Sequence, residues 1–157
     1  AKHVYANRFS APDKTLWTIY NNTGHTFVGE VLAVALTPEE HVVDLLRCEE
    51  ADVRMIGGEQ VVHLFLPRDD VTCLAVLPKQ ISVTQTNDAI EVSVSGAATG
   101  QTVKLCDTTG LPIASCPVEN GTVRFELPEI PEAGPAPSCV KLCDGWRLVD
   151  MAATTDP

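Results

Sequence analysis

The chain has 157 residues, of which 45% are hydrophobic and 20% are charged, and its formal net charge at pH 7 is −10. This composition is typical of one or two folded domains, and no apolar run approaches the roughly 20 residues that a membrane helix needs. An acidic surface repels phosphate backbones, and the basic residues form no cluster, so we expect neither nucleic acid nor a membrane as a partner.

The first half of the chain alternates apolar and polar residues with a period of two, which predicts β-strands. Short turns rich in Pro, Asp, Asn and Gly separate the strands. The one helical turn that we expect lies around 37–42, where Thr37 would cap it and Pro38 would take its first position. The predicted strands are 3–9, 15–22, 25–34, 41–47, 52–56, 60–66 and 71–77.

Pro78 and Lys79 close this first set of strands, and the chain after them is richer in Ser and Thr. We therefore place a domain boundary there, with one domain at 1–79 and a second at 80–157. The segment 128–137 holds four prolines, so it is predicted to be a crossover loop or an edge segment. The residues after 151 are predicted to fray. The predicted strands of the second domain are 81–86, 89–95, 101–107, 113–118, 122–127, 138–143 and 147–151.

The string VKLCD occurs twice in the second domain, at 103–107 and at 140–144. We interpret it as two strands with similar positions in a sheet. Strand alternation then points Cys106 and Cys143 outward, together with Lys104 and Lys141. Strands at about 10-residue spacing with one long crossover are typical of an immunoglobulin-like sandwich. The fold class is therefore predicted as all-β, with two tandem antiparallel β-sandwich domains, the second Ig-like.

The chain has six cysteines and four histidines, and neither set has the spacing of a metal site. We expect no metal ion and no cofactor. Free thiols and one or two disulfides in the second half both remain open. The cysteines are Cys48, Cys73, Cys106, Cys116, Cys139 and Cys143.

Catalytic patterns are missing from the sequence as well. The acidic pairs at 39–40, 49–50 and 69–70 could suggest the two carboxylates of a glycosidase, but each falls in a predicted turn, where such pairs usually face solvent. There is no G-x-S-x-G motif and no cysteine with a histidine nearby in the sequence. We therefore expect a chain that is not an enzyme.

Exposed aromatic side chains are the best candidates for a binding site, because sugar-binding proteins stack pyranose rings on them. In 15–22, Trp17 and Ile19 share one face and Tyr20 lies on the other, so one of the two aromatics is expected to be exposed. The alternative is that the cores use most of the aromatics. The candidate carbohydrate-binding residues are Trp17, Tyr20 and Trp146, and Tyr5 completes the set of Trp and Tyr residues.

The segment NRFSAPDKTLWTIYNNTGHTFVGEVL, with HVVDLL and HLFLPRDDVTCLAVLPK after it, resembles the C-terminal β-sandwich that follows the catalytic (β/α)₈ barrel in several glycoside hydrolase families. In those domains an N-R-F strand, a D-x-K/R-T turn, an L-W/Y-T-x-Y-N strand and a G-E-V/L strand recur in this order. The resemblance covers about 1–79. The matching residues are Asn7, Arg8, Phe9, Asp13, Lys14, Thr15, Leu16, Trp17, Thr18, Tyr20, Asn21, Gly29 and Glu30.

The resemblance implies a module that packs on the barrel, with the catalytic carboxylates in the barrel itself. Residues 80–157 are similar to bacterial Ig-like or fibronectin-III-like appendages, and no functional residue carries over from either family. The chain also begins without Met and without a signal peptide. We expect a non-catalytic accessory fragment of a larger carbohydrate-active bacterial protein, with the parent catalytic domain as its partner in cis. The alternative is a carbohydrate-binding module, and the context favours an extracellular or periplasmic location.

Overall fold

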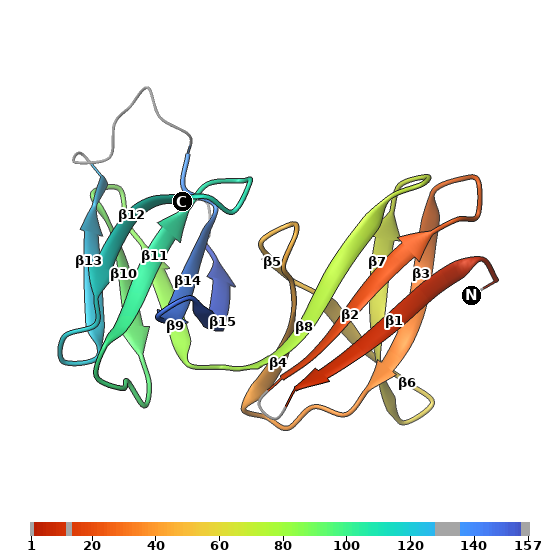
Figure 1. Cartoon of the computed structure of the whole chain (residues 1–157), viewed down its shortest axis with the longest axis horizontal. Coiled ribbons are helices and arrows are strands. Elements are labelled where there is room, and N and C mark those ends of the chain that lie inside the picture. The colour runs from red at the N-terminus through yellow and green to blue at the C-terminus, as the bar shows by residue number, and fades with distance from the viewer. Residues whose placement is uncertain (1, 12–13, 128–135, 155–157) are drawn as a thin grey trace. The chain divides into compact units, whose positions relative to one another are not determined.

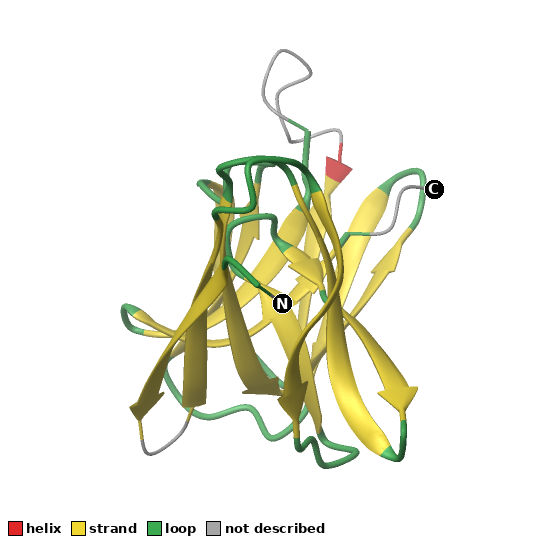
Figure 2. Cartoon of the chain, turned by 90° about the vertical axis from the view of Figure 1, so that its right-hand side faces the viewer, coloured by secondary structure: helices red, strands yellow, loops and turns green. Residues whose placement is uncertain are grey.

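The computed structural model describes residues 2–11, 14–127 and 136–154. Its described residues form antiparallel strands and turns and include no α-helix, and the short red segment in Figure 2 is a 3₁₀ turn at Leu127. The predicted all-β fold class is therefore confirmed. Asp13 and residues 128–135, which include most of the proline-rich segment, lie outside the described residues.

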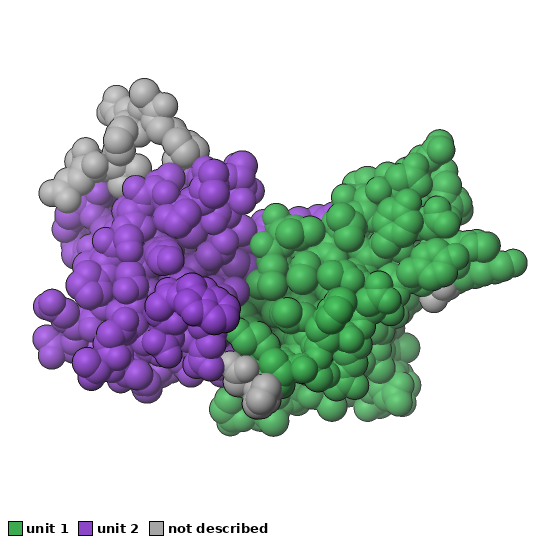
Figure 3. All heavy atoms as spheres, viewed as in Figure 1, with its two compact units in different colours: residues 1–46, 50–77 green, residues 47–49, 78–157 purple. Residues whose placement is uncertain are grey.

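The chain divides into two compact units (Figure 3). The first comprises residues 1–46 and 50–77, and the second comprises residues 47–49 and 78–157. The sequence-based boundary after Lys79 lies close to the point at which the second unit begins.

Two sheets make up the first unit (Figure 1). Period-2 alternation gives each sheet one apolar face, and these faces form a core that includes Ile19, Val62 and Leu74, all 0% exposed. In the order of their hydrogen bonding, the strands are β1 (Val4–Ala11), β2 (Lys14–Asn21), β8 (Val71–Pro78), β4 (Glu40–Asp44) and β5 (Glu49–Glu50) in one sheet, and β3 (Phe27–Val34), β7 (Glu59–Leu66) and β6 (Asp52–Ile56) in the other.

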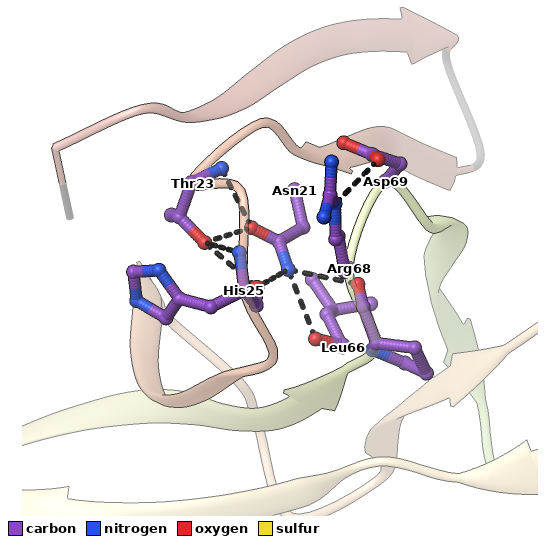
Figure 4. Close-up of polar contacts among 7 residues, drawn as sticks. Asn21, Thr23, His25, Leu66, Arg68 and Asp69 are labelled. Atoms are coloured by element: carbon purple, nitrogen blue, oxygen red, sulfur yellow. Dashed lines mark hydrogen bonds and ion pairs between the residues drawn. The ribbon is translucent and has the colours of Figure 1, made fainter.

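A buried amide fastens the turn after β2 to the turn after β7 (Figure 4). The Asn21 side chain is 0% exposed, and its Nδ2 donates to the carbonyl oxygens of His25 at 2.9 Å, Leu66 at 3.0 Å and Pro67 at 2.8 Å. Its Oδ1 accepts from the Thr23 amide at 3.1 Å and the Thr23 hydroxyl at 2.7 Å. One buried side chain thus has its own donors and acceptor satisfied by backbone and side-chain groups of the two turns.

The second unit also has two sheets, and its core consists mainly of Val, Leu and Ile from both of them. Ile90 and Val92 are 0% exposed, in agreement with the inward orientation that strand alternation gives them. The strands are β13 (Thr122–Glu126), β10 (Ala89–Val94) and β9 (Ile81–Gln85) in one sheet, and β12 (Pro112–Pro117), β11 (Gln101–Cys106), β14 (Cys139–Asp144) and β15 (Arg147–Ala153) in the other.

A buried carboxylate holds the start of β9. Asp150 is 0% exposed, and its Oδ2 accepts from the backbone amides of Gln80 at 2.7 Å and Ile81 at 2.8 Å. Its Oδ1 accepts from the amide of Met151 at 2.7 Å. A buried carboxylate needs such donors. Through these hydrogen bonds Asp150 links β15, the last strand of the unit, to the start of β9, its first strand.

The structure corrects several sequence-based expectations. The predicted helical turn at 37–42 is a β-turn closed by the Glu40 amide and the Thr37 carbonyl, at 3.1 Å, and β4 begins at Glu40 itself. The Glu40 carboxylate accepts from the Thr37 amide at 3.0 Å, so this single turn is stabilised without a helix behind it. Residues 49–50, predicted as part of a turn, form β5, and β15 extends to Ala153 where fraying was predicted.

The outward positions in the VKLCD strings need a further correction. Cys106 and Cys143 do lie on the opposite face from Val103 and Leu142, since each directly follows a core leucine, Leu105 or Leu142, in its strand. Both are nevertheless buried, at 0% and 6% exposure. Alternation predicts which face a side chain takes, but not whether that face is covered.

Candidate binding surface

Aromatic side chains gather on the outer face of the β1–β2 hairpin. The register pairs Tyr5 with Tyr20 and, at the other end of the hairpin, Phe9 with Leu16. Tyr20 is also the partner of Val71 on β8. Successive side chains alternate between faces, so these five residues lie on the same side of the sheet, and we call them the aromatic face. Their side chains are close enough across the strands to present a continuous surface.

The aromatic face is largely solvent-exposed and its five residues are uncharged, while Lys14, on the same side, lies at the end of the hairpin opposite Ala11. Tyr5 is 52% exposed, Phe9 56%, Tyr20 40% and Val71 46%. The row between the two aromatic rows holds Asn7, Thr18 and Cys73, so it adds no charge. In a chain of net charge −10, an exposed and uncharged area of this kind is a candidate for an interaction surface.

Trp17 and Tyr20 lie on opposite faces of β2. Trp17 packs against the core of the first unit, beside Ile19. The guanidinium carbon of Arg8 lies 5.9 Å from the centre of its ring, within the range of a cation–π contact. The structure therefore exposes Tyr20 and leaves Trp17 half-buried, so the two do not form one stacking surface.

Trp146, the third predicted binding residue, belongs to the second unit and lies in the turn between β14 and β15. It is 95% exposed, which is unusual for so large an apolar side chain. Gly145 precedes it with φ +61°, a left-handed conformation that glycine adopts without strain and that the tight turn requires.

The other sheet of the first unit has a different outer face. Val28 and Phe65 are register partners there and are 59% and 63% exposed. The next row, however, carries charge: Glu30 is the partner of His63, and His63 is the partner of Asp52. This face therefore combines an apolar row with a charged one, unlike the aromatic face.

Arg54 neutralises part of that charge. Its Nε and one terminal nitrogen donate to Asp52 Oδ2 at 2.8 Å and 2.6 Å, and His63 Nδ1 lies 3.7 Å from the same oxygen. The hydrogen bond from Arg54 lowers the pKa of Asp52 below its usual value. Because Asp52 is exposed and ion-paired, its shift reflects a surface salt bridge rather than a catalytic carboxyl.

Of the acidic pairs weighed as catalytic carboxylates, Asp69–Asp70 makes local contacts, whereas Glu50 Oε1 lies 3.7 Å from His41 Nδ1. Asp69 pairs with its neighbour Arg68 at 3.0 Å, and Asp70 accepts from the Val71 amide at 2.9 Å. Glu49 and Glu50 are exposed. Within the described ranges, no group of three or more His, Cys, Asp or Glu side chains could hold a metal ion.

Of the aromatic face, sequence reasoning named Tyr20 as a binding residue and mentioned Tyr5 beside it, but it missed Phe9, Leu16 and Val71. The search for stacking surfaces covered only Trp and Tyr, although Phe9 has the same parity as Tyr5 in β1 and could have been assigned to its face. Val71 could not have been assigned to this face from the sequence, because its place beside Tyr20 depends on which strands pair.

No helix among the described residues is long and apolar enough to cross a membrane. Comparison with protein-family models finds no match, and comparison with curated proteins finds none either.

Proposed function

We propose that this chain is a non-catalytic accessory module of a larger, carbohydrate-active bacterial protein, and that it docks on a neighbouring domain of that protein through the aromatic face. The observation that carries this proposal is the exposure of Tyr5, Phe9 and Tyr20 on a side of the β1–β2 hairpin whose one charged residue, Lys14, lies at its far end opposite Ala11. Centres of protein interfaces are enriched in aromatic residues and depleted of charge, which is the composition of this face.

The position of the hairpin also supports docking. β1 is the outermost strand of its sheet, so one side of its backbone has no strand partner within that sheet. Such an edge, next to an apolar face, is a liability for a free domain unless a partner covers it. A neighbouring domain in cis would cover both and would be present at a high effective concentration.

The strand order of the second unit supports the proposed Ig-like assignment. Three strands, β13-β10-β9, face four strands, β12-β11-β14-β15. Two antiparallel sheets with this number of strands, around a core of alternating apolar residues, are typical of Ig-like and fibronectin-like sandwiches. Such modules commonly serve as appendages, which agrees with an accessory role.

The experiment measures the affinity of this chain for the domain that precedes it in its parent protein, by calorimetric titration. Tyr5→Ser and Tyr20→Ser should each weaken the dissociation constant about tenfold, since a truncated interface aromatic typically costs more than about 1 kcal/mol. Phe65→Ser is the matched control, because Phe65 is more exposed than either tyrosine but lies on the other sheet. Equal effects of all three variants, or no binding at all, would reject docking through the aromatic face.

The second candidate function is carbohydrate binding, which the 95% exposure of Trp146 favours. An exposed indole can stack on a pyranose ring. Affinity electrophoresis on immobilised polysaccharides tests this with Trp146→Ala and Tyr20→Ala. Trp17→Phe serves as the control, because Trp17 faces the core. Saturable retardation that either alanine variant abolishes, and the control keeps, would establish sugar binding in place of docking.

A further inference from the structure

Two cysteines of the second unit lie directly opposite each other on neighbouring strands. Cys106 is the last residue of β11 and Cys139 is the first residue of β14, and the antiparallel register makes them partners. Both are 0% exposed and both are free thiols. The chain therefore holds a cross-strand dithiol inside a single sheet.

The spacing of antiparallel strands suits a disulfide. Directly opposite residues have Cα atoms about 4.5 or 5.5 Å apart, depending on the type of pair, and both values fall in the window of about 4.4–6.8 Å that disulfides adopt. Their Cβ atoms, at about 4.5–5.5 Å, are slightly further apart than in most disulfides. Both residues lie at strand ends, and the β11–β12 register shifts between Leu105 and Cys106. A small backbone movement can occur there with little disturbance of the ladder.

No other cysteine of the second unit has a cysteine as its register partner. Cys116 is opposite Val103, and Cys143 is opposite Thr102. Cys48, which lies in the 47–49 segment of this unit, contributes to the raised pKa of Cys139 and is therefore the competing sulfur. Cys48 has no strand register to hold it opposite Cys139, and its φ of +57° is an uncommon conformation for a residue other than glycine. The paired strands thus favour Cys106.

We propose that Cys106 and Cys139 form an oxidation site at which a small hydroperoxide closes a disulfide between β11 and β14. The thiols are fully buried, so the oxidant must be close to water in size, and hydrogen peroxide meets that condition.

Cys106 is the attacking sulfur. The hydrogen bond from Cys139 lowers the pKa of Cys106 to about 7, and the same hydrogen bond raises the pKa of Cys139. At neutral pH the Cys106 thiolate attacks one peroxide oxygen and breaks the O–O bond, and the departing hydroxide takes up a proton as water. The sulfur of Cys139 then attacks the resulting sulfenic acid, whose hydroxyl leaves with the Cys139 proton as a second water. One peroxide is reduced to two waters while two thiols are oxidised to one disulfide.

The test is peptide mapping of the folded chain after exposure to hydrogen peroxide, with the remaining thiols blocked under denaturing conditions. Trypsin cuts after Lys104, Arg124 and Lys141, so Cys106 falls in peptide 105–124 and Cys139 in peptide 125–141. Peptide 105–124 also contains Cys116, so the experiment uses Cys116→Ser, in which a link between the two peptides identifies Cys106–Cys139 alone.

The expected result is the loss of two thiols and a single linked pair, 105–124 with 125–141, reversible by a thiol reductant. Adding Cys106→Ser to Cys116→Ser should abolish the link, with a melting curve recorded to show that the double variant is folded. The urea-unfolded chain, oxidised in the same way, should give a mixture of links and shows that the oxidant is active. A folded chain that links peptide 48–54 to 125–141, or that keeps its thiols while the unfolded chain is oxidised, would overturn the proposal.

Discussion

Replacing the buried amide of Asn21 gives a direct test of how the first unit is held together. Asn21→Ala removes the donor that serves the Leu66 and Pro67 carbonyls and the acceptor that serves Thr23. The two bonds to the Leu66 and Pro67 carbonyls contribute about 1 kcal/mol each, and leaving the buried Leu66 carbonyl without this donor costs about 1 kcal/mol more, which gives a destabilisation of about 3 kcal/mol. A domain is typically stable by about 5–15 kcal/mol, so the loss is large but tolerable.

Asn21→Asp separates hydrogen bonding from size. The two side chains have nearly the same shape, but a carboxylate cannot donate to the three carbonyl oxygens around Nδ2 and would face them with negative charge. At pH 7 this variant should be less stable than Asn21→Ala, by about 1–2 kcal/mol more.

The pH dependence of Asn21→Asp has a definite sign. Burial beside carbonyl oxygens raises the pKa of the introduced carboxyl in the folded state above about 3.9, its value in the unfolded state. As the pH rises above that value the unfolded chain ionises first, so the variant loses stability. Its deficit relative to Asn21→Ala should therefore shrink towards pH 4.

Urea unfolding followed by tryptophan fluorescence is the assay. Trp17 is half-buried against the first core, while Trp146 is 95% exposed and should change little in emission when the chain unfolds. The signal therefore reports mainly on the first unit, which avoids treating a two-unit chain as a single transition. If Asn21→Asp were as stable as Asn21→Ala at pH 7, the amide would not act as a donor in the way the structure shows.

Three further predictions concern the second unit. Asp150→Ala should destabilise the second unit by about 3 kcal/mol, because three backbone amides lose their acceptor. Asp150→Asn should destabilise it by less, as measured by thermal or urea unfolding. Equal effects of the two variants would contradict the role of the carboxylate. Leu142→Ala should cost about 3 kcal/mol in the same assay, while Leu111→Ala, at 64% exposure, should stay within about 0.5 kcal/mol. A hydrogen bond from Thr109 lowers the pKa of Asp107, so this residue contributes stability above about pH 4 that is lost as the pH falls through its folded pKa. Asp107→Asn should therefore flatten the acid limb of the stability curve, and an unchanged limb would show that Asp107 does not contribute to it.

Strand positions could be predicted from the sequence because they depend on local pattern. In 89–95 the alternation of Ile90, Val92 and Val94 with polar residues determines both the strand and its inward face. The two-residue strand at Glu49–Glu50 was missed because it has no alternation of its own and exists only through pairing with β4.

Polar residues that act at long range could not be predicted. Asn21 has the sequence context of a turn residue, and nothing nearby shows that it reaches Pro67. The same holds for Asp150, whose amide partner Ile81 lies at the other end of the second unit's sequence. Burial of these side chains depends on tertiary contacts rather than on local preference.

The candidate surface was predicted in part. Alternation placed Trp17 and Tyr20 on opposite faces of one strand, but it did not indicate which face was inward. The choice depends on β8, whose Leu74 is the partner of Trp17 and belongs to the core. Only the assembled sheet therefore shows that the exposed aromatics are Tyr5, Phe9 and Tyr20.

Hydroxyl-radical footprinting tests the docking role of the aromatic face most directly, because it measures the solvent access of individual side chains. The isolated chain and the full-length parent protein would be oxidised side by side and compared at Tyr5, Phe9 and Tyr20, with Phe65 as the internal reference. We predict that these three residues become several-fold less reactive in the full-length protein while Phe65 does not change. Equal reactivity of Tyr5, Phe9 and Tyr20 in both proteins would contradict the account.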